Sequence, residues 1–190
     1  MNRERHQYDS TAADFEKALD ASDTLNKNSS KTLLAYIEHL FTIKHFDTLL
    51  LLIDDLITLD PNQHRYHYIK GESLRLTERY NLGITSLHYA IGLAPAISDY
   101  YDSIARAYSA LEKYEKACEY AKVGLEIAPS NADNWVHLGD CYRHRNRFKK
   151  ALFCFEKGKT SQTYPLALAL CLREKKKHED NTLENICMSV

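Results

Sequence analysis

Apolar residues recur along most of the chain at spacings of three and four, the period of an amphipathic α-helix. Pro61, Pro95 and Pro129 lie 34 residues apart and close the apolar stretches LITLDP, IGLAP and LEIAP. Because proline cannot continue a helix, each of these prolines marks a helix end. The pattern predicts an all-α protein built from a repeated unit.

Small and aromatic residues follow the same step as the prolines. Gly71, Ala105 and Gly139 are also 34 residues apart and would let two helices approach closely. A unit of this length is a helical hairpin that cannot bury its own apolar face, so stacked neighbours must build a continuous core. Further positions at this step are Leu74, Tyr108 and Tyr142, followed by Tyr80, Tyr114 and Phe148.

The clearest unit reads Trp135-x2-Leu138-Gly139-x2-Tyr142, then Ala151-x3-Phe155. This string resembles the consensus of the tetratricopeptide repeat, and the resemblance extends over residues 30–163 with decreasing agreement toward the N-terminus. It implies a right-handed α-solenoid of stacked helix-turn-helix repeats with capping helices at both ends. It also implies a protein that binds another protein rather than one that catalyses a reaction.

The expected organisation has four parts. Residues 1–29 form a polar segment with one amphipathic helix, and residues 30–163 form four repeats. Residues 164–177, apolar at first and basic at the end, form a capping helix, because cations suit the C-terminal end of a helix dipole. Residues 178–190 are expected to be a flexible tail. The repeats are expected at 30–63, which is divergent, and at 64–97, 98–131 and 132–163.

The resemblance implies that the first helix of each repeat lines a concave groove, so groove residues can be chosen by helical phase. The chosen positions carry both charge signs, which predicts a partner segment of mixed charge; the alternative is that they are ordinary solvated helix positions. Some tetratricopeptide proteins bind the C-terminal tail of heat-shock chaperones with a clamp of Lys, Asn and Arg side chains. We do not expect this clamp here, because the corresponding helix positions include the acids Glu72 and Asp133, which would repel a tail carboxylate. The expected groove residues are Tyr68, Glu72, Arg75, Asp102, Arg106, Asp140 and Arg143.

The net charge of the whole chain is close to zero, but one region has an excess of basic residues. The chain has a net charge of -1, while residues 140–178 hold 11 Lys and Arg against 3 Asp and Glu. The cluster could attract nucleic acid or acidic proteins, but exposed charge around a turn is the favoured explanation. Nucleic acid is therefore kept as a third, less favoured partner class. The cluster consists of Arg143, His144, Arg145, Arg147, Lys149 and Lys150.

No common phosphate-binding, hydrolase or zinc-protease string occurs, so we expect neither an enzyme nor a cofactor. His137 and Cys141 have a spacing that could hold zinc, but no second pair accompanies them, which favours packing over a metal site. The five cysteines are odd in number and contain no C-x-x-C. Together with the absence of a signal peptide and of a membrane span, they predict a cytoplasmic protein with reduced thiols.

The sequence thus favours an adaptor or scaffold that binds a protein segment in the groove. A small chaperone resembling the tetratricopeptide chaperones of bacterial secretion systems is the alternative, because it combines an N-terminal helix with about three repeats. The sequence allows a homo-oligomer and does not identify the partner.

Overall fold

A computed structural model describes the backbone of residues 27–187 and the side chains of residues 30–181. Within this part of the chain, nine α-helices and no strand are present, and they divide into two compact units at residues 93 and 94. The predicted all-α repeat solenoid is confirmed. The amphipathic helix predicted within residues 1–29 lies outside the described residues, apart from the start of the first helix.

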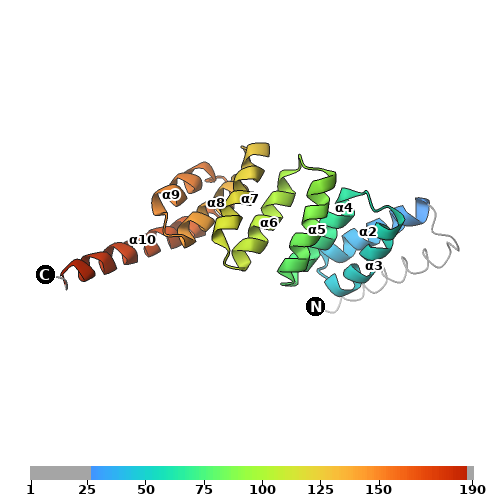
Figure 1. Cartoon of the computed structure of the whole chain (residues 1–190), viewed down its shortest axis with the longest axis horizontal. Helices are drawn as coiled ribbons and strands as arrows, with labels where there is room; N and C mark the ends of the chain where they lie inside the picture. The colour runs from blue at the N-terminus through green and yellow to red at the C-terminus, as the bar shows by residue number, and fades with distance from the viewer. Residues whose placement is uncertain (1–26, 188–190) are drawn as a thin grey trace. The chain divides into compact units, whose positions relative to one another are not determined.

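The first unit contains two helical hairpins (Figure 1). Helix α2 (Lys27–Thr42) pairs with α3 (Phe46–Leu59), and α4 (His64–Leu76) pairs with α5 (Tyr80–Leu93). Ile37, Leu49 and Ile53 are fully buried, in a core that α2 and α3 share with Tyr66 and Ile69 of α4. A Cβ added at Gly71 would lie only 2.7 Å from Leu87 Cγ, which shows how closely α4 and α5 approach.

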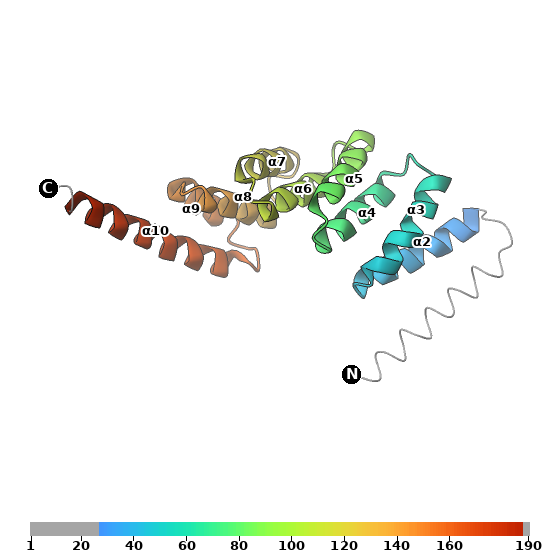
Figure 2. The ribbon, with the colours of Figure 1, turned by 60° about the horizontal axis from the view of Figure 1, so that its bottom comes forward.

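The second unit contains two further hairpins and a long final helix. Helix α6 (Ser98–Ala110) pairs with α7 (Tyr114–Ile127), α8 (Ala132–His144) pairs with α9 (Phe148–Lys157), and α10 (Tyr164–Cys187) packs on α8 and α9. Small and aromatic residues fill the core, where Ala117, Ala151 and Phe155 are fully buried. Figure 2 shows α10 running beside α9 and continuing beyond it.

The four hairpins share one turn geometry. The second residue after each first helix has a positive φ: Lys44 (61°), Glu78 (62°), Glu112 (57°) and Asn146 (56°). The next N–H donates to the carbonyl five residues earlier, as in Lys113 N to Tyr108 O at 2.9 Å, which is the Schellman arrangement. These residues are 34 apart, so the divergent first hairpin keeps the register of the others.

The repeated prolines have a structural role beyond ending a helix. His67 Nε2 lies 2.8 Å from the carbonyl oxygen of Pro61. In the second unit, Tyr101 Oη and Trp135 Nε1 donate to the carbonyl oxygens of Pro95 (2.9 Å) and Pro129 (2.8 Å). In three of the four hairpins, one polar aromatic ring therefore links the first helix to the loop before it.

The C-terminal helix is longer than the sequence suggested. We expected it to end at residue 177 and a flexible tail to begin at His178, but α10 continues to Cys187. That expectation is wrong for residues 178–187, where the helix that packs on α8 and α9 continues. Residues 188–190 lie outside the described part.

Candidate protein-binding site

The first helices of the second unit carry a polar network that crosses from α6 to α8. His137 Nδ1 lies 2.7 Å from Asp102 Oδ1, and His137 Nε2 lies 3.1 Å from a guanidinium nitrogen of Arg106. The Arg106 guanidinium also lies 3.5 Å from Asp102. Because arginine can only donate, His137 Nε2 accepts and Nδ1 carries the proton given to Asp102. The network fixes these three side chains relative to one another.

A hollow of about 240 Å³ lies beside this network. One wall is a stacked pair, with the rings of Tyr114 and His144 4.5 Å apart and nearly parallel. Arg106 borders the hollow and its side chain is 43% exposed, so it can donate further hydrogen bonds to an incoming group. The remaining lining includes Ser109, His137, Asp140, Cys141 and Arg143.

Arg143 is nearly buried and links α8 to the final helix. Its Nε donates to Asp140 Oδ1 at 3.0 Å, and one terminal nitrogen donates to Glu174 Oε1 on α10 at 2.7 Å. Burial lowers the pKa of Arg143, but the hydrogen bonds that it donates to Glu174 and Asp140, together with the negative charges of these two residues, raise it, so the pKa is raised overall. Arg143 therefore links α8 to α10 through one hydrogen bond, while its other two bonded nitrogens contact Asp140 and His144 on α8.

His144 is the second histidine of this region. A terminal nitrogen of Arg143 lies 2.8 Å from His144 Nε2 and donates to it. Burial, followed by the neighbouring positive charge of Arg143, lowers the pKa of His144. The imidazole is therefore held as an acceptor stacked on Tyr114.

The first unit has a smaller polar site on α2 and α4. Arg65 on α4 pairs with Glu38 on α2 at 2.6 Å, beside a hollow of about 290 Å³ that Tyr68 also lines. On the same helix, Glu72 is buried and accepts a hydrogen bond from Arg75 Nε at 3.0 Å. Glu72 and Arg75 thus neutralise each other within α4.

Six of the seven predicted groove residues therefore form three local pairs, while Tyr68 lines the hollow beside Arg65. The structure pairs Glu72 with Arg75, Asp102 with Arg106 and Asp140 with Arg143. Their role in partner binding stays a prediction. Helical phase did not single out His137 or Glu174 as members of these networks, although His137 had been considered as a metal ligand.

Two other sequence candidates have packing partners. Cys141 is buried and its Sγ lies 3.3 Å from Ser109 Oγ, which is a packed position. In the basic cluster, Arg145 pairs with Glu115 at 2.9 Å and Lys150 lies over the ring of Tyr142 at 5.6 Å. Within the described helices, none is long and apolar enough to cross a membrane.

The fold and these networks define an α-helical repeat protein with polar first-helix faces. A family model described as tetratricopeptide repeat matches residues 98–131 and 132–162. These segments coincide with the α6–α7 and α8–α9 hairpins. The two hairpins of residues 98–162 therefore match the tetratricopeptide repeat.

Solved structures of other proteins share the fold of this chain. A crystal structure of MamA aligns over 94% of this chain and 94% of its own length, with a TM-score of 0.71 and 20% identity. The structure of YrrB, described as a tetratricopeptide protein with an unusual peptide-binding site, aligns over 87% of this chain and 84% of its own, with a TM-score of 0.68 and 17% identity.

One curated relative has a stated role. The heat-shock protein cognate co-chaperone sgt12 of Aspergillus fumigatus is 30% identical over 89 residues, which is 47% of this chain and 26% of that protein. The chain thus matches about a quarter of the length of this relative.

Proposed function

We propose that this protein is an adaptor that binds a segment of another protein on its first-helix faces and catalyses no reaction itself. The observation that carries the proposal is the Asp102–His137–Arg106 network, which fixes a partly exposed guanidinium beside a hollow of about 240 Å³. A side chain held in place by its neighbours loses little entropy when it binds, which favours recognition at this point.

The chemistry of the hollow supports a partner segment of mixed charge. Arg106 can donate to a carboxylate or a backbone carbonyl, while the Asp140 side chain is 35% exposed and can accept from a cation or an N–H group. A protein segment offers both kinds of group within a few residues. The peptide-binding site named for YrrB and the co-chaperone role of sgt12 agree with a binding function.

The proposal places the protein in a reducing compartment such as the cytoplasm. Cys118, Cys141, Cys154 and Cys171 are buried and free, as expected for thiols that are kept reduced.

The test starts with affinity capture on the full chain from its native host, identification of captured proteins, and peptide arrays that tile them. Binding of the best peptide is then measured for the wild type and for Arg106→Glu. We expect the substitution to weaken binding at least about fivefold, the effect of a hot-spot residue worth about 1 kcal/mol.

Lys122→Glu is the matched control, since Lys122 is an exposed residue on the second helix α7. It should leave the affinity unchanged. Equal affinity of Arg106→Glu and the wild type would exclude the α6–α8 hollow as the binding site.

A further inference from the structure

A second surface of the C-terminal unit has a different character from the first-helix face. Two hollows lie on α9 and share Lys149 and Lys150 in their linings. One, of about 330 Å³, has Trp135, Tyr142 and Phe153 in its wall. The other, of about 430 Å³, lies between the start of α9 and α10 and contains Phe148. We call these two hollows and the lysines between them the α9 face.

The α9 face is positively charged. Lys149, Lys150 and Arg147 are exposed, and none of the three forms an ion pair with any residue from 30 to 181. The one carboxylate in the linings is Glu179, which already lies 3.6 Å from Lys175. An occupant of this face would therefore meet uncompensated positive charge, which favours an anion.

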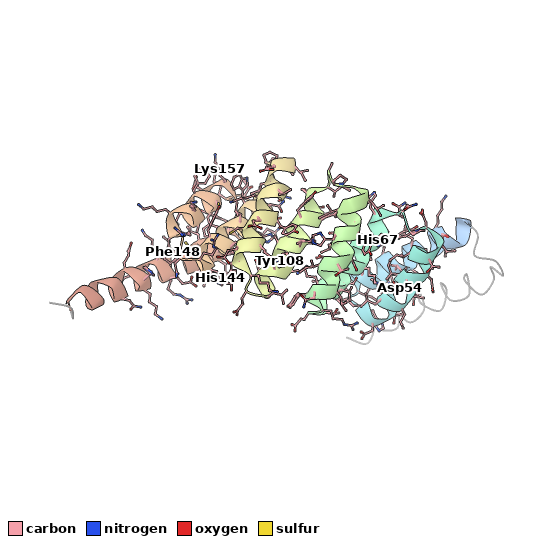
Figure 3. The ribbon with its side chains drawn as sticks, viewed as in Figure 1. Asp54, His67, Tyr108, His144, Phe148 and Lys157 are labelled. Atoms are coloured by element: carbon pink, nitrogen blue, oxygen red, sulfur yellow. The ribbon has the colours of Figure 1, made fainter. Side chains whose placement is uncertain are left out.

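The same face exposes apolar surface. Phe153 is 58% exposed although it is a large aromatic residue, and its ring meets Trp135 edge to face at 6.2 Å. Figure 3 shows Phe148 near α10 and Lys157 at the opposite end of α9, and the α9 residues that line the two hollows run from Phe148 to Cys154. Exposed aromatic surface between hollows of this size is typical of interaction sites.

The aromatic rings are poorly placed for nucleobases. Lys150 lies over the ring of Tyr142, Lys157 lies over that of Phe153 at 5.7 Å, and His178 contacts the ring of Phe148 at 5.7 Å. Single-stranded nucleic acids bind by stacking bases on free ring faces, and here lysines already cover such faces. Aliphatic side chains can still enter the hollows beside the rings.

From this combination we propose that the α9 face binds an acidic protein segment carrying apolar side chains, which places a second partner site outside the first-helix face. The carboxylates pair with Lys149, Lys150 and Arg147, and apolar side chains three or four positions apart enter the two hollows. This arrangement corresponds to an acidic amphipathic helix on a groove, a known mode of peptide recognition.

The experiment measures fluorescence anisotropy of a labelled acidic helical peptide that bears phenylalanine and leucine at spacings of three and four, added to the full chain. We expect saturable binding that weakens as salt rises, because screening reduces the attraction between charges. Replacing the phenylalanine and leucine of the peptide by serine should weaken binding about tenfold. A peptide that binds equally well without its apolar residues would overturn the proposal, as would the absence of saturable binding.

Variants of the protein locate the site. Lys149→Glu/Lys150→Glu should weaken binding about tenfold or more. The control Lys116→Glu/Lys122→Glu makes the same change in net charge on α7, where Lys116 lies over a tyrosine as Lys150 does. Circular dichroism verifies that both variants are folded.

The control should bind within about twofold of the wild type. Equal loss in the two variants would show attraction by net charge alone and refute the site. A single-stranded RNA that binds more tightly than the peptide, and loses affinity in Lys149→Glu/Lys150→Glu, would refute the protein partner.

Discussion

Arg143 gives the sharpest test of how the last repeat is held together. Arg143→Met keeps the long apolar stem of the side chain but removes the guanidinium. In the structure this group donates to Asp140 at 3.0 Å and to Glu174 at 2.7 Å, and its side chain is only 9% exposed. The substitution leaves two carboxylates close to each other without their shared cation.

The expected loss of stability in Arg143→Met depends on how exposed Asp140 and Glu174 are to water. Removing one member of a buried ion pair costs about 3–5 kcal/mol, but the Asp140 and Glu174 side chains are 35% and 37% exposed and water can solvate them. Solvation reduces the loss, so we expect Arg143→Met to lower the free energy of unfolding by about 2 kcal/mol. The double variant Arg143→Met/Glu174→Gln should recover about 1 kcal/mol of this, because it also removes one stranded charge.

Urea unfolding followed by circular dichroism measures the loss, and amide hydrogen exchange of α10 shows whether the helix detaches. Arg147→Met is the control, since Arg147 is exposed and has no ion pair within residues 30–181. It should change stability by less than about 0.5 kcal/mol. The reasoning fails if Arg143→Met costs no more than this control, or if α10 exchange is unchanged.

Four further substitutions test other parts of the structure. Glu112→Gly should stabilise the protein by about 0.5–1 kcal/mol in urea unfolding, because Glu112 has a φ of 57°, which glycine adopts more easily; a loss would contradict this. Gly71→Ala should destabilise by about 1–3 kcal/mol, as the new Cβ would lie 2.7 Å from a leucine, whereas Gly92→Ala has nothing within 4 Å and should stabilise by up to about 1 kcal/mol. The pKa of His144 is lowered by burial and by Arg143, so the unfolded chain binds protons more readily and stability should fall between about pH 7 and pH 5. In His144→Phe, which can retain the stack on Tyr114, the fall measured by thermal unfolding should be smaller; an identical pH profile would exclude His144 as its source.

The fold could be predicted from the sequence at positions where a residue type is restricted to one structural role. Proline at Pro61, Pro95 and Pro129 ends helices, and the structure shows that each also accepts a hydrogen bond from the ring six residues later. Gly71 lies at a close helix crossing. Backbone geometry favours proline or glycine at these positions. Their spacing therefore predicted the repeat architecture without any knowledge of side-chain contacts.

The candidate site was less accessible to sequence reasoning. Helical phase shows that Glu72 and Arg75 share a face, but not that they pair with each other and that Glu72 is buried. The partner of Arg143 is Glu174, and no local pattern connects residues so far apart. The length of α10 was also missed, because residues 178–182 are all polar and were interpreted as the start of a solvated tail.

The fold changes after the last hairpin, at the point where the sequence departs from the repeat pattern. In the last unit Thr163 stands where a closing proline is expected, and α9 ends already at Lys157. Ser161 in the following turn donates to Asp133 at 2.5 Å and accepts from the backbone N–H of Thr163 at 3.2 Å, so hydrogen bonds to α8 replace the proline. The chain then enters α10 at Tyr164 and lies across α8 and α9. Since Arg143 and the α9 face both depend on this placement of α10, the departure from the consensus also creates the features that distinguish this end of the array.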